Sequence, residues 1–151
     1  MNAELDALLR LLETADESHQ RMRLQFGLQC ALRVEPLLED DEVRACLNRF
    51  KRLMESGTGW VDVADLAAEA ERLANRHPGS RSLDGVGHAA VSATYACAKA
   101  MGGRARQAAE YAAYAAVYGQ GGYGATTDPD SFKPEQEWQL SCLRSLLSPV
   151  P

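Results

Sequence analysis

The chain has 151 residues, of which 46% are hydrophobic and 25% are charged, and its formal net charge at pH 7 is −5. This length and composition predict a single domain over residues 1–151 with a sizeable hydrophobic core. The acidic balance argues against a general nucleic-acid binder and against a protein that adsorbs to anionic membranes.

The ends and apolar runs of the sequence carry no targeting signal that we recognise. The first residues lack the basic and apolar regions of a secretion signal. No apolar run reaches the roughly 20 residues that a membrane-spanning helix needs. We therefore expect a cytoplasmic protein.

The cysteines and histidines do not suggest a metal site. The four cysteines are spread along the chain, without a C-x-x-C pair, and each falls in a helical apolar pattern: Cys30, Cys46, Cys97 and Cys142. We interpret them as buried free thiols, although two disulfides with any of three connectivities would also fit. The histidines His19, His77 and His88 are too scattered to complete a ligand set. No metal and no cofactor are expected.

Helical spacing of apolar residues predicts four helices in the first half of the chain. The first covers residues 3–15, and the second begins at an Asp16 or Ser18 cap and runs to about Val34, before Pro36. The third follows the acidic run and extends to about residue 55. The fourth is expected to start with Asp62 as its cap and to end before Pro78. Trp60, in the loop between them, is either a core anchor or a binding residue, and we favour the core.

Four consecutive carboxylates, at Glu39, Asp40, Asp41 and Glu42, precede the third helix. Asp40 or Asp41 can cap the helix, and the negative charges suit the positive end of its dipole. The same run could instead form an acidic patch for a basic partner. Both interpretations can hold together.

The stretch from Ser82 to Tyr118 is dense in alanine and is interrupted once, by Gly102-Gly103. It predicts two helices joined by a tight glycine turn and packed closely through their small side chains. We expect this helical hairpin to be the packing centre of the domain. Tyr111, Tyr114 and Tyr118 recur at helical spacing and should form one aromatic stripe.

Residues 119–130 are expected to form a long glycine-rich loop. Gly119 to Gly124 matches G-x-G-x-x-G, but no strand precedes it, which excludes a dinucleotide-binding fingerprint. Long loops in small domains often bind partners. A last helix opens near Pro134. The whole pattern predicts an all-α fold of about seven helices.

Catalytic motifs are missing from the sequence. There is no G-x-S-x-G, no H-E-x-x-H and no E-x-x-H pair. His88 is the one candidate general base, with Tyr95 or Tyr111 expected nearby. We favour a protein without enzymatic activity and without catalytic residues.

Several stretches between residues 20 and 147 match one known pattern. The run from Cys30 to Glu39, CALRVEPLLE, is similar to the signature A-x-R-V-L-P-L-F-E and departs from it at Glu35 and Leu38. A basic helix, Gly57 and alanine-rich helices follow in the same order, and Glu135-x-x-Trp138-Gln139 matches a closing E-x-x-W-Q helix. These features resemble the fifth Imm class of bacterial immunity proteins from polymorphic-toxin systems.

The resemblance implies a small, helical, non-catalytic cytoplasmic protein that binds and neutralises a cognate toxin domain, encoded beside it, by occluding the active site of that domain. Candidate contacts lie on surfaces that the core does not use: Tyr123 as an aromatic anchor, Asp128 and Asp130, and the run Glu39, Asp40, Asp41 and Glu42. Two alternatives remain. One is a helical scaffold that self-associates, for instance as a homodimer. The other is a small enzyme that uses His88.

Overall fold

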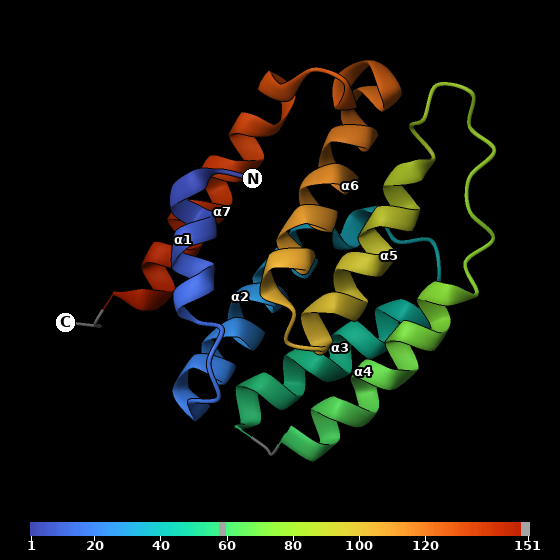
Figure 1. The fold of residues 1–151 in the computed structure, drawn as a ribbon. Helices are drawn as coiled ribbons and strands as arrows, with labels where there is room; N and C mark the ends of the chain where they lie inside the picture. The colour runs from blue at the N-terminus through green and yellow to red at the C-terminus, as the bar shows by residue number, and fades with distance from the viewer. Residues whose placement is uncertain (58–59, 149–151) are drawn as a thin grey trace.

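The computed structural model describes residues 1–57 and 60–148, except the side chains of residues 60 and 61. Within those ranges all regular structure is helical, as predicted, with seven α-helices and two short 3-10 helices (Figure 1). The elements in chain order are α1 (Ala3–Leu11), α2 (Glu17–Val34), η1 (Glu35–Leu37), α3 (Asp41–Ser56), α4 (Trp60–Asn75), α5 (His88–Met101), α6 (Ala105–Thr126), η2 (Pro129–Phe132) and α7 (Lys133–Leu147). The expected placement of the Trp60 side chain falls outside the described residues.

Short polar side chains set the starts of the first three helices. Asn2, Asp16 and Asp40 each accept a hydrogen bond from a backbone N–H group of the helix that follows. The predicted caps of α2 and α3 are therefore confirmed. The predicted cap of α4 was wrong, because α4 already begins at Trp60 and Asp62 lies inside its first turn. A carboxylate at that position still complements the helix dipole.

The alanine-rich hairpin of α5 and α6 lies at the centre of the fold (Figure 1). Ala93 and Ala112, one from each arm, are 0% and 2% exposed. The two arms meet at the turn of Gly102 and Gly103, where Gly103 has a φ of 72°. Helix α2 packs against both arms, α4 packs against α5, and α3 packs against α2, α4 and α5. The hairpin is the packing centre that the alanine pattern predicted.

One glycine permits the close approach of α2 to the hairpin. A Cβ atom placed on Gly27 would lie 3.0 Å from Cα of Ala100 and 3.1 Å from its Cβ. Both residues are buried. The two backbones are therefore nearer than larger side chains would allow.

The glycine-rich segment after Tyr118 is not a loop, so that prediction was wrong. Helix α6 continues to Thr126, with a kink at Gly121 and Gly122, and Gly122 has φ 59° and ψ −144°. The backbone N–H of Tyr123 donates to the carbonyl oxygen of Asp84 at 2.7 Å. A Cβ atom on Gly122 would lie 1.9 Å from that oxygen. Contact with the segment before α5 thus holds the kinked helix, despite the low helix propensity of glycine.

The cysteines are all free thiols, and the structure buries three of them fully: Cys30, Cys46 and Cys97. Burial raises the pKa of the Cys97 thiol to about 12. Cys142 is half-buried. The expectation of buried thiols is thus confirmed for three of the four.

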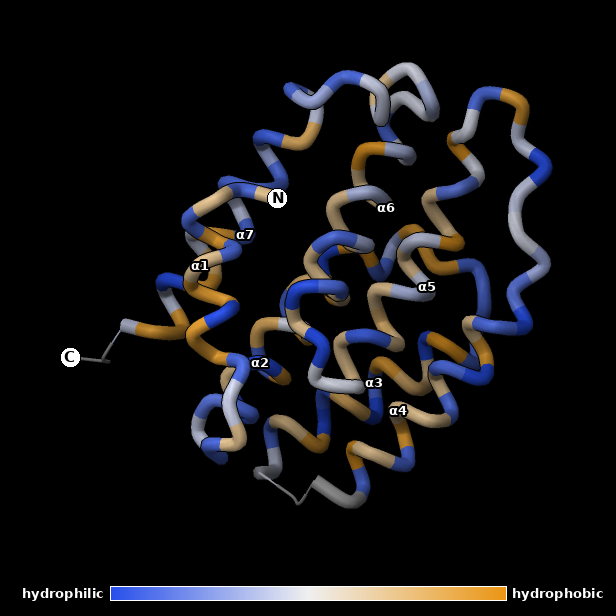
Figure 2. The backbone as a smooth tube through the Cα atoms, in the orientation of Figure 1, coloured by the Kyte–Doolittle hydropathy of each residue, from blue (hydrophilic) through white to orange (hydrophobic). Residues whose placement is uncertain are grey.

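The helices carry both hydrophilic and hydrophobic residues along their length (Figure 2). The segment that joins α4 to α5, residues 76–87, is mostly hydrophilic. It does contain a hydrophobic residue, Leu83, whose side chain is 99% exposed. Among the described residues, no helix is long and apolar enough to cross a bilayer.

Candidate functional site

Five rings form a continuous row over the C-terminal half of α6 and the elements beside it. Phe132 meets Tyr114 with a centroid distance of 4.9 Å, and Tyr114 meets Tyr118 at 6.0 Å. Tyr118 in turn meets Tyr123 at 6.1 Å and His88 at 5.3 Å. We call these five residues the aromatic row. Edge-to-face and tilted geometries of this kind stabilise ring pairs beyond the area they bury.

The predicted stripe included Tyr111, but Tyr111 is not part of the aromatic row. Its ring stacks on Tyr95 with a centroid distance of 5.4 Å, and the Tyr95 hydroxyl donates to Oδ1 of Asn75 at 3.2 Å. The predicted stripe is therefore correct for Tyr114 and Tyr118 and wrong for Tyr111. Tyr111 lies at the N-terminal end of the predicted stripe, and its ring packs on Tyr95 of α5 instead of on Tyr114.

Within the aromatic row, His88 contacts Tyr123 as well as Tyr118. Its Nε2 atom and the Tyr123 hydroxyl lie 2.5 Å apart, and the two ring centroids are 5.3 Å apart. In the described part of the chain no carboxylate contacts the imidazole. The expectation that Tyr95 or Tyr111 would lie beside His88 was wrong, because Tyr95 is seven residues further along α5, or about 10 Å. His88 therefore helps to hold the Tyr123 ring in place.

The segment before α5 holds Tyr123 from its other side. Oδ1 of Asp84 accepts hydrogen bonds from the Ser82 hydroxyl at 2.6 Å and from the Val86 N–H at 3.1 Å. These bonds, the hydroxyl first, lower the pKa of the Asp84 carboxyl. The next residue, Gly85, has a φ of 87°, and a Cβ atom there would lie 2.8 Å from Cγ of Tyr123. Only glycine allows the backbone to approach the ring so closely.

The aromatic row is partly open to solvent. Tyr114 and Tyr123 are each 45% exposed, and Val86, in the segment before α5, is 41% exposed. Exposed apolar side chains grouped together, unlike single ones, mark binding surfaces. Tyrosine is also among the residues that contribute most to protein interfaces.

Carboxylates border the row, and we call Asp84, Asp128 and Asp130 the acidic rim. Asp128 caps η2 by accepting from the N–H of Asp130 at 3.0 Å. Asp130 forms an ion pair with Lys133 at 2.9 Å. All three carboxylates are exposed. Tyr123, Asp128 and Asp130, which the sequence selected as contacts, are thus all exposed, and their role in binding stays a prediction.

The run from Glu39 to Glu42 forms a separate acidic group at the start of α3. Asp40 caps the helix by accepting from the N–H of Glu42 at 2.8 Å, and Asp41 pairs with Arg44 at 3.0 Å. Glu42 lies 3.7 Å from Arg76. The capping interpretation of this run is thus confirmed. A partner role stays a prediction, and much of the negative charge is already opposed by arginines within the chain.

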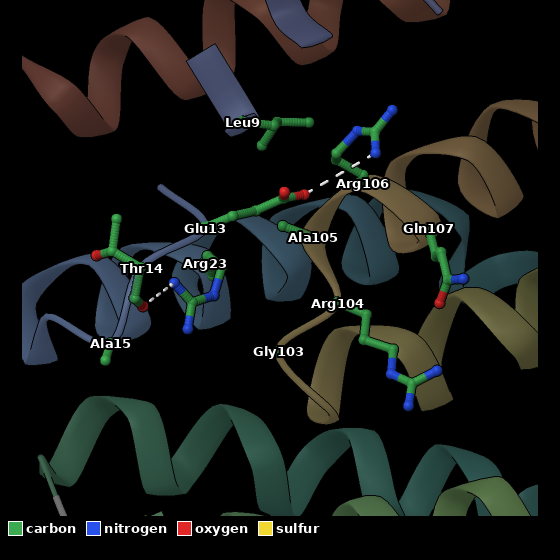
Figure 3. Close-up of a pocket in the computed structure, with 10 residues that line it drawn as sticks. All are labelled: Leu9, Glu13, Thr14, Ala15, Arg23, Gly103, Arg104, Ala105, Arg106 and Gln107. Carbon is green, nitrogen blue, oxygen red and sulfur yellow. Dashed lines mark hydrogen bonds and ion pairs between the residues drawn. The ribbon is translucent and has the colours of Figure 1, made fainter. Parts of the chain in front are cut away.

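A cavity of about 580 Å³ lies where the α1–α2 connection meets the α5–α6 turn (Figure 3). Three arginines line it, but two of them are bound within the chain. Arg23 donates to the carbonyl oxygens of Thr14, at 3.0 Å, and Leu12. Arg106 pairs with Asp6 at 2.6 Å and reaches Glu13 at 3.9 Å. We interpret these arginines as ties that hold α1 and its connection in place.

No family model, no curated protein and no solved structure matches this chain. The resemblance to the immunity proteins therefore stays a prediction. Among the described residues, no group of three or more His, Cys, Asp or Glu side chains is arranged to hold a metal ion.

Sequence reasoning missed how the site is assembled. It placed Tyr123 on a loop, and it linked neither His88 nor Asp84 to that residue. The segment Ser82-Leu83-Asp84-Gly85 did carry a signal, because Asp followed by Gly is typical of a tight turn. A second signal was the pair Gly121-Gly122, which marks a point where another backbone can approach closely.

Proposed function

We propose that this protein is an immunity protein, which binds a cognate toxin domain through the aromatic row and the acidic rim and blocks the active site of that domain. The observation that carries the proposal is the exposed row of tyrosines bordered by carboxylates. The resemblance of the sequence to immunity proteins supplies the class of partner. A cytoplasmic location follows from the same proposal.

The chemistry of the surface favours a basic partner. Exposed tyrosines would fill apolar depressions on the toxin domain, and carboxylates would attract a cationic cleft. Domains that act on nucleic acids or nucleotides commonly carry such clefts, because they bind phosphate groups. An inhibitor of this kind would bury roughly 1,200–2,000 Å² in the complex.

The test is growth of cells that express the product of the neighbouring gene with or without this chain. The proposal expects the neighbour to be toxic alone and harmless together with this chain, and expects the two proteins to co-purify. A neighbour that is harmless alone, or equally toxic in both settings, would refute it.

The surface is tested in the same assay with Tyr123→Ala, Asp128→Asn and Asp130→Asn combined. Asparagine can still cap η2, so the change removes mainly an aromatic anchor and two charges. We expect binding to weaken roughly 100-fold, about 3 kcal/mol, with loss of protection. Tyr123 also contacts Gly85, so its loss could affect folding. A second variant therefore carries only Asp128→Asn and Asp130→Asn, and it should associate with the toxin domain more slowly than the unmodified protein in low salt.

A matched control changes exposed residues elsewhere. Leu11, the last residue of α1, is 69% exposed. Leu11→Ala with Glu17→Gln should leave protection and melting temperature unchanged. If the control and the surface variant protect equally well, the interface lies elsewhere. A stable homodimer in light scattering that persists without any outside partner would favour the self-associating scaffold instead.

A further inference from the structure

A second cavity, of about 300 Å³, opens beside the aromatic row between α6, η2 and α7. Tyr114 and Phe132 of the row form part of its wall, and Met1 and Pro129 add further apolar surface. Ala109 and Ala113 lie deep in it, at 0% and 5% exposed. Its volume is at the lower end of the range for ligand pockets.

Gln139 is the most buried polar residue in this wall, at 2% exposed. Its Nε2 atom donates to the carbonyl oxygen of Ala109 at 2.8 Å. A carbonyl can only accept, so this contact fixes the orientation of the amide and turns Oε1 away from Ala109.

The Oε1 atom of Gln139 accepts no hydrogen bond from any described residue. In the same part of the chain, no side-chain nitrogen or oxygen is both fully enclosed and unpartnered. The oxygen therefore keeps some access to solvent, and Gln139 lines the cavity. A ligand N–H group that donates to this oxygen would replace a water molecule there.

The lining decides which donor fits. No side chain of the described wall is cationic. Besides Gln139, its polar side chains are Glu110, which is exposed, and Thr126 and Gln136, which are half-buried. At the buried end of the cavity, beside Gln139 and the two alanines, a guanidinium or ammonium group would have to lose its water for a neutral acceptor, which is unfavourable. An indole ring loses little by leaving water, packs edge-to-face on Tyr114 and Phe132, and has one N–H donor and no acceptor.

We infer that this cavity binds an indole ring, with the ring N–H donating to Oε1 of Gln139. If the proposed function holds, the ring is a tryptophan side chain of the toxin domain, inserted beside the aromatic row as an anchor. Only this assignment of the source rests on the proposed function. The site itself is tested without any partner.

The experiment titrates the full-length protein with N-acetyl-tryptophan amide and follows the side-chain amide signals of Gln139 by NMR. We expect saturable shifts with a dissociation constant in the millimolar range or below. The 1-methyl derivative, which lacks the ring N–H, should bind about fivefold more weakly, as expected for one lost hydrogen bond. N-acetyl-arginine amide should not saturate the site.

Ala113→Met serves as the blocking variant, because Ala113 lines the cavity and the longer side chain would fill part of it. It should abolish the shifts while the melting temperature confirms folding. If it fails to fold, the comparison of the two tryptophan derivatives on the unmodified protein still decides. Absence of saturation, equal affinity for the 1-methyl derivative, or tighter binding of the arginine amide would each overturn the inference. Saturable indole binding by a protein that gives no protection in the growth assay would retain the site and refute the proposed function.

Discussion

Arg33 and Glu135 show how single residues hold the last helix in place. Nε of Arg33 donates to Oε2 of Glu135 at 2.8 Å, and Nη2 donates to Oε1 at 3.0 Å. The guanidinium also lies 4.2 Å from the centroid of the Trp138 ring. The hydrogen bond that Arg33 donates to Glu135, countered in part by burial, raises the pKa of Arg33. A planar, bidentate contact of this kind is specific to arginine.

We predict that Arg33→Met lowers the free energy of unfolding by about 2 kcal/mol, measured by urea denaturation. The change strands the Glu135 carboxylate, whose side chain is only 9% exposed. Breaking a fully buried pair costs about 3–5 kcal/mol, but Arg33 is 36% exposed, so water moderates the loss here.

The double variant Arg33→Met, Glu135→Leu is the control for that prediction. It should recover part of the lost stability, because no charge is left unpaired. A double variant less stable than the sum of the two single changes would show that the contact between the charges is not the source of the effect.

At the scale of elements, the packing of α2 on α5 depends on Gly27. We predict that Gly27→Ala destabilises the protein by about 1–3 kcal/mol in thermal or urea unfolding. The added methyl group would meet backbone and Cβ atoms of Ala100 at 3.0–3.1 Å. The gain in helix propensity, about 1 kcal/mol, is too small to compensate.

Gly124 provides the matched control, because it too lies within a helix but has nothing within 4 Å of an added Cβ atom. Gly124→Ala should leave stability unchanged or raise it by up to about 1 kcal/mol. If both variants gained stability, α2 and α5 would not approach as closely as described.

The elements differ in how far the sequence could predict them. Apolar spacing and alanine content predicted the seven helices, and carboxylates predicted two caps, because both signals are local. The kinked end of α6 could not be predicted in this way. Its helix depends on a backbone contact with Asp84, and Gly85 and Gly122 look like loop residues until that contact is known.

The candidate site shows the same limit. Tyr123, Asp128 and Asp130 could be selected from the sequence as surface residues near one another in the chain. The contacts of Tyr123 with His88 and Asp84, and the open Oε1 of Gln139, are contacts between residues far apart in the chain. No short-range pattern encodes them.

For the whole molecule, the buried α5–α6 hairpin supports a surface that combines the aromatic row, the acidic rim and the cavity beside Gln139. Leu37 of η1 also lies against Gly119 of α6, 3.4 Å from an added Cβ atom, so η1 packs against the same helix that carries the tyrosines. The central claim is that a protein partner covers this face.

Amide hydrogen exchange of the chain, alone and mixed with the purified product of the neighbouring gene, tests that claim most directly. Our account predicts that the partner slows exchange in two segments, residues 82–88 and residues 114–132. Exchange of the amides around Arg23 and around Arg104 should stay unchanged. Slowed exchange confined to the cavity of Figure 3, or no change anywhere in the chain, would contradict it.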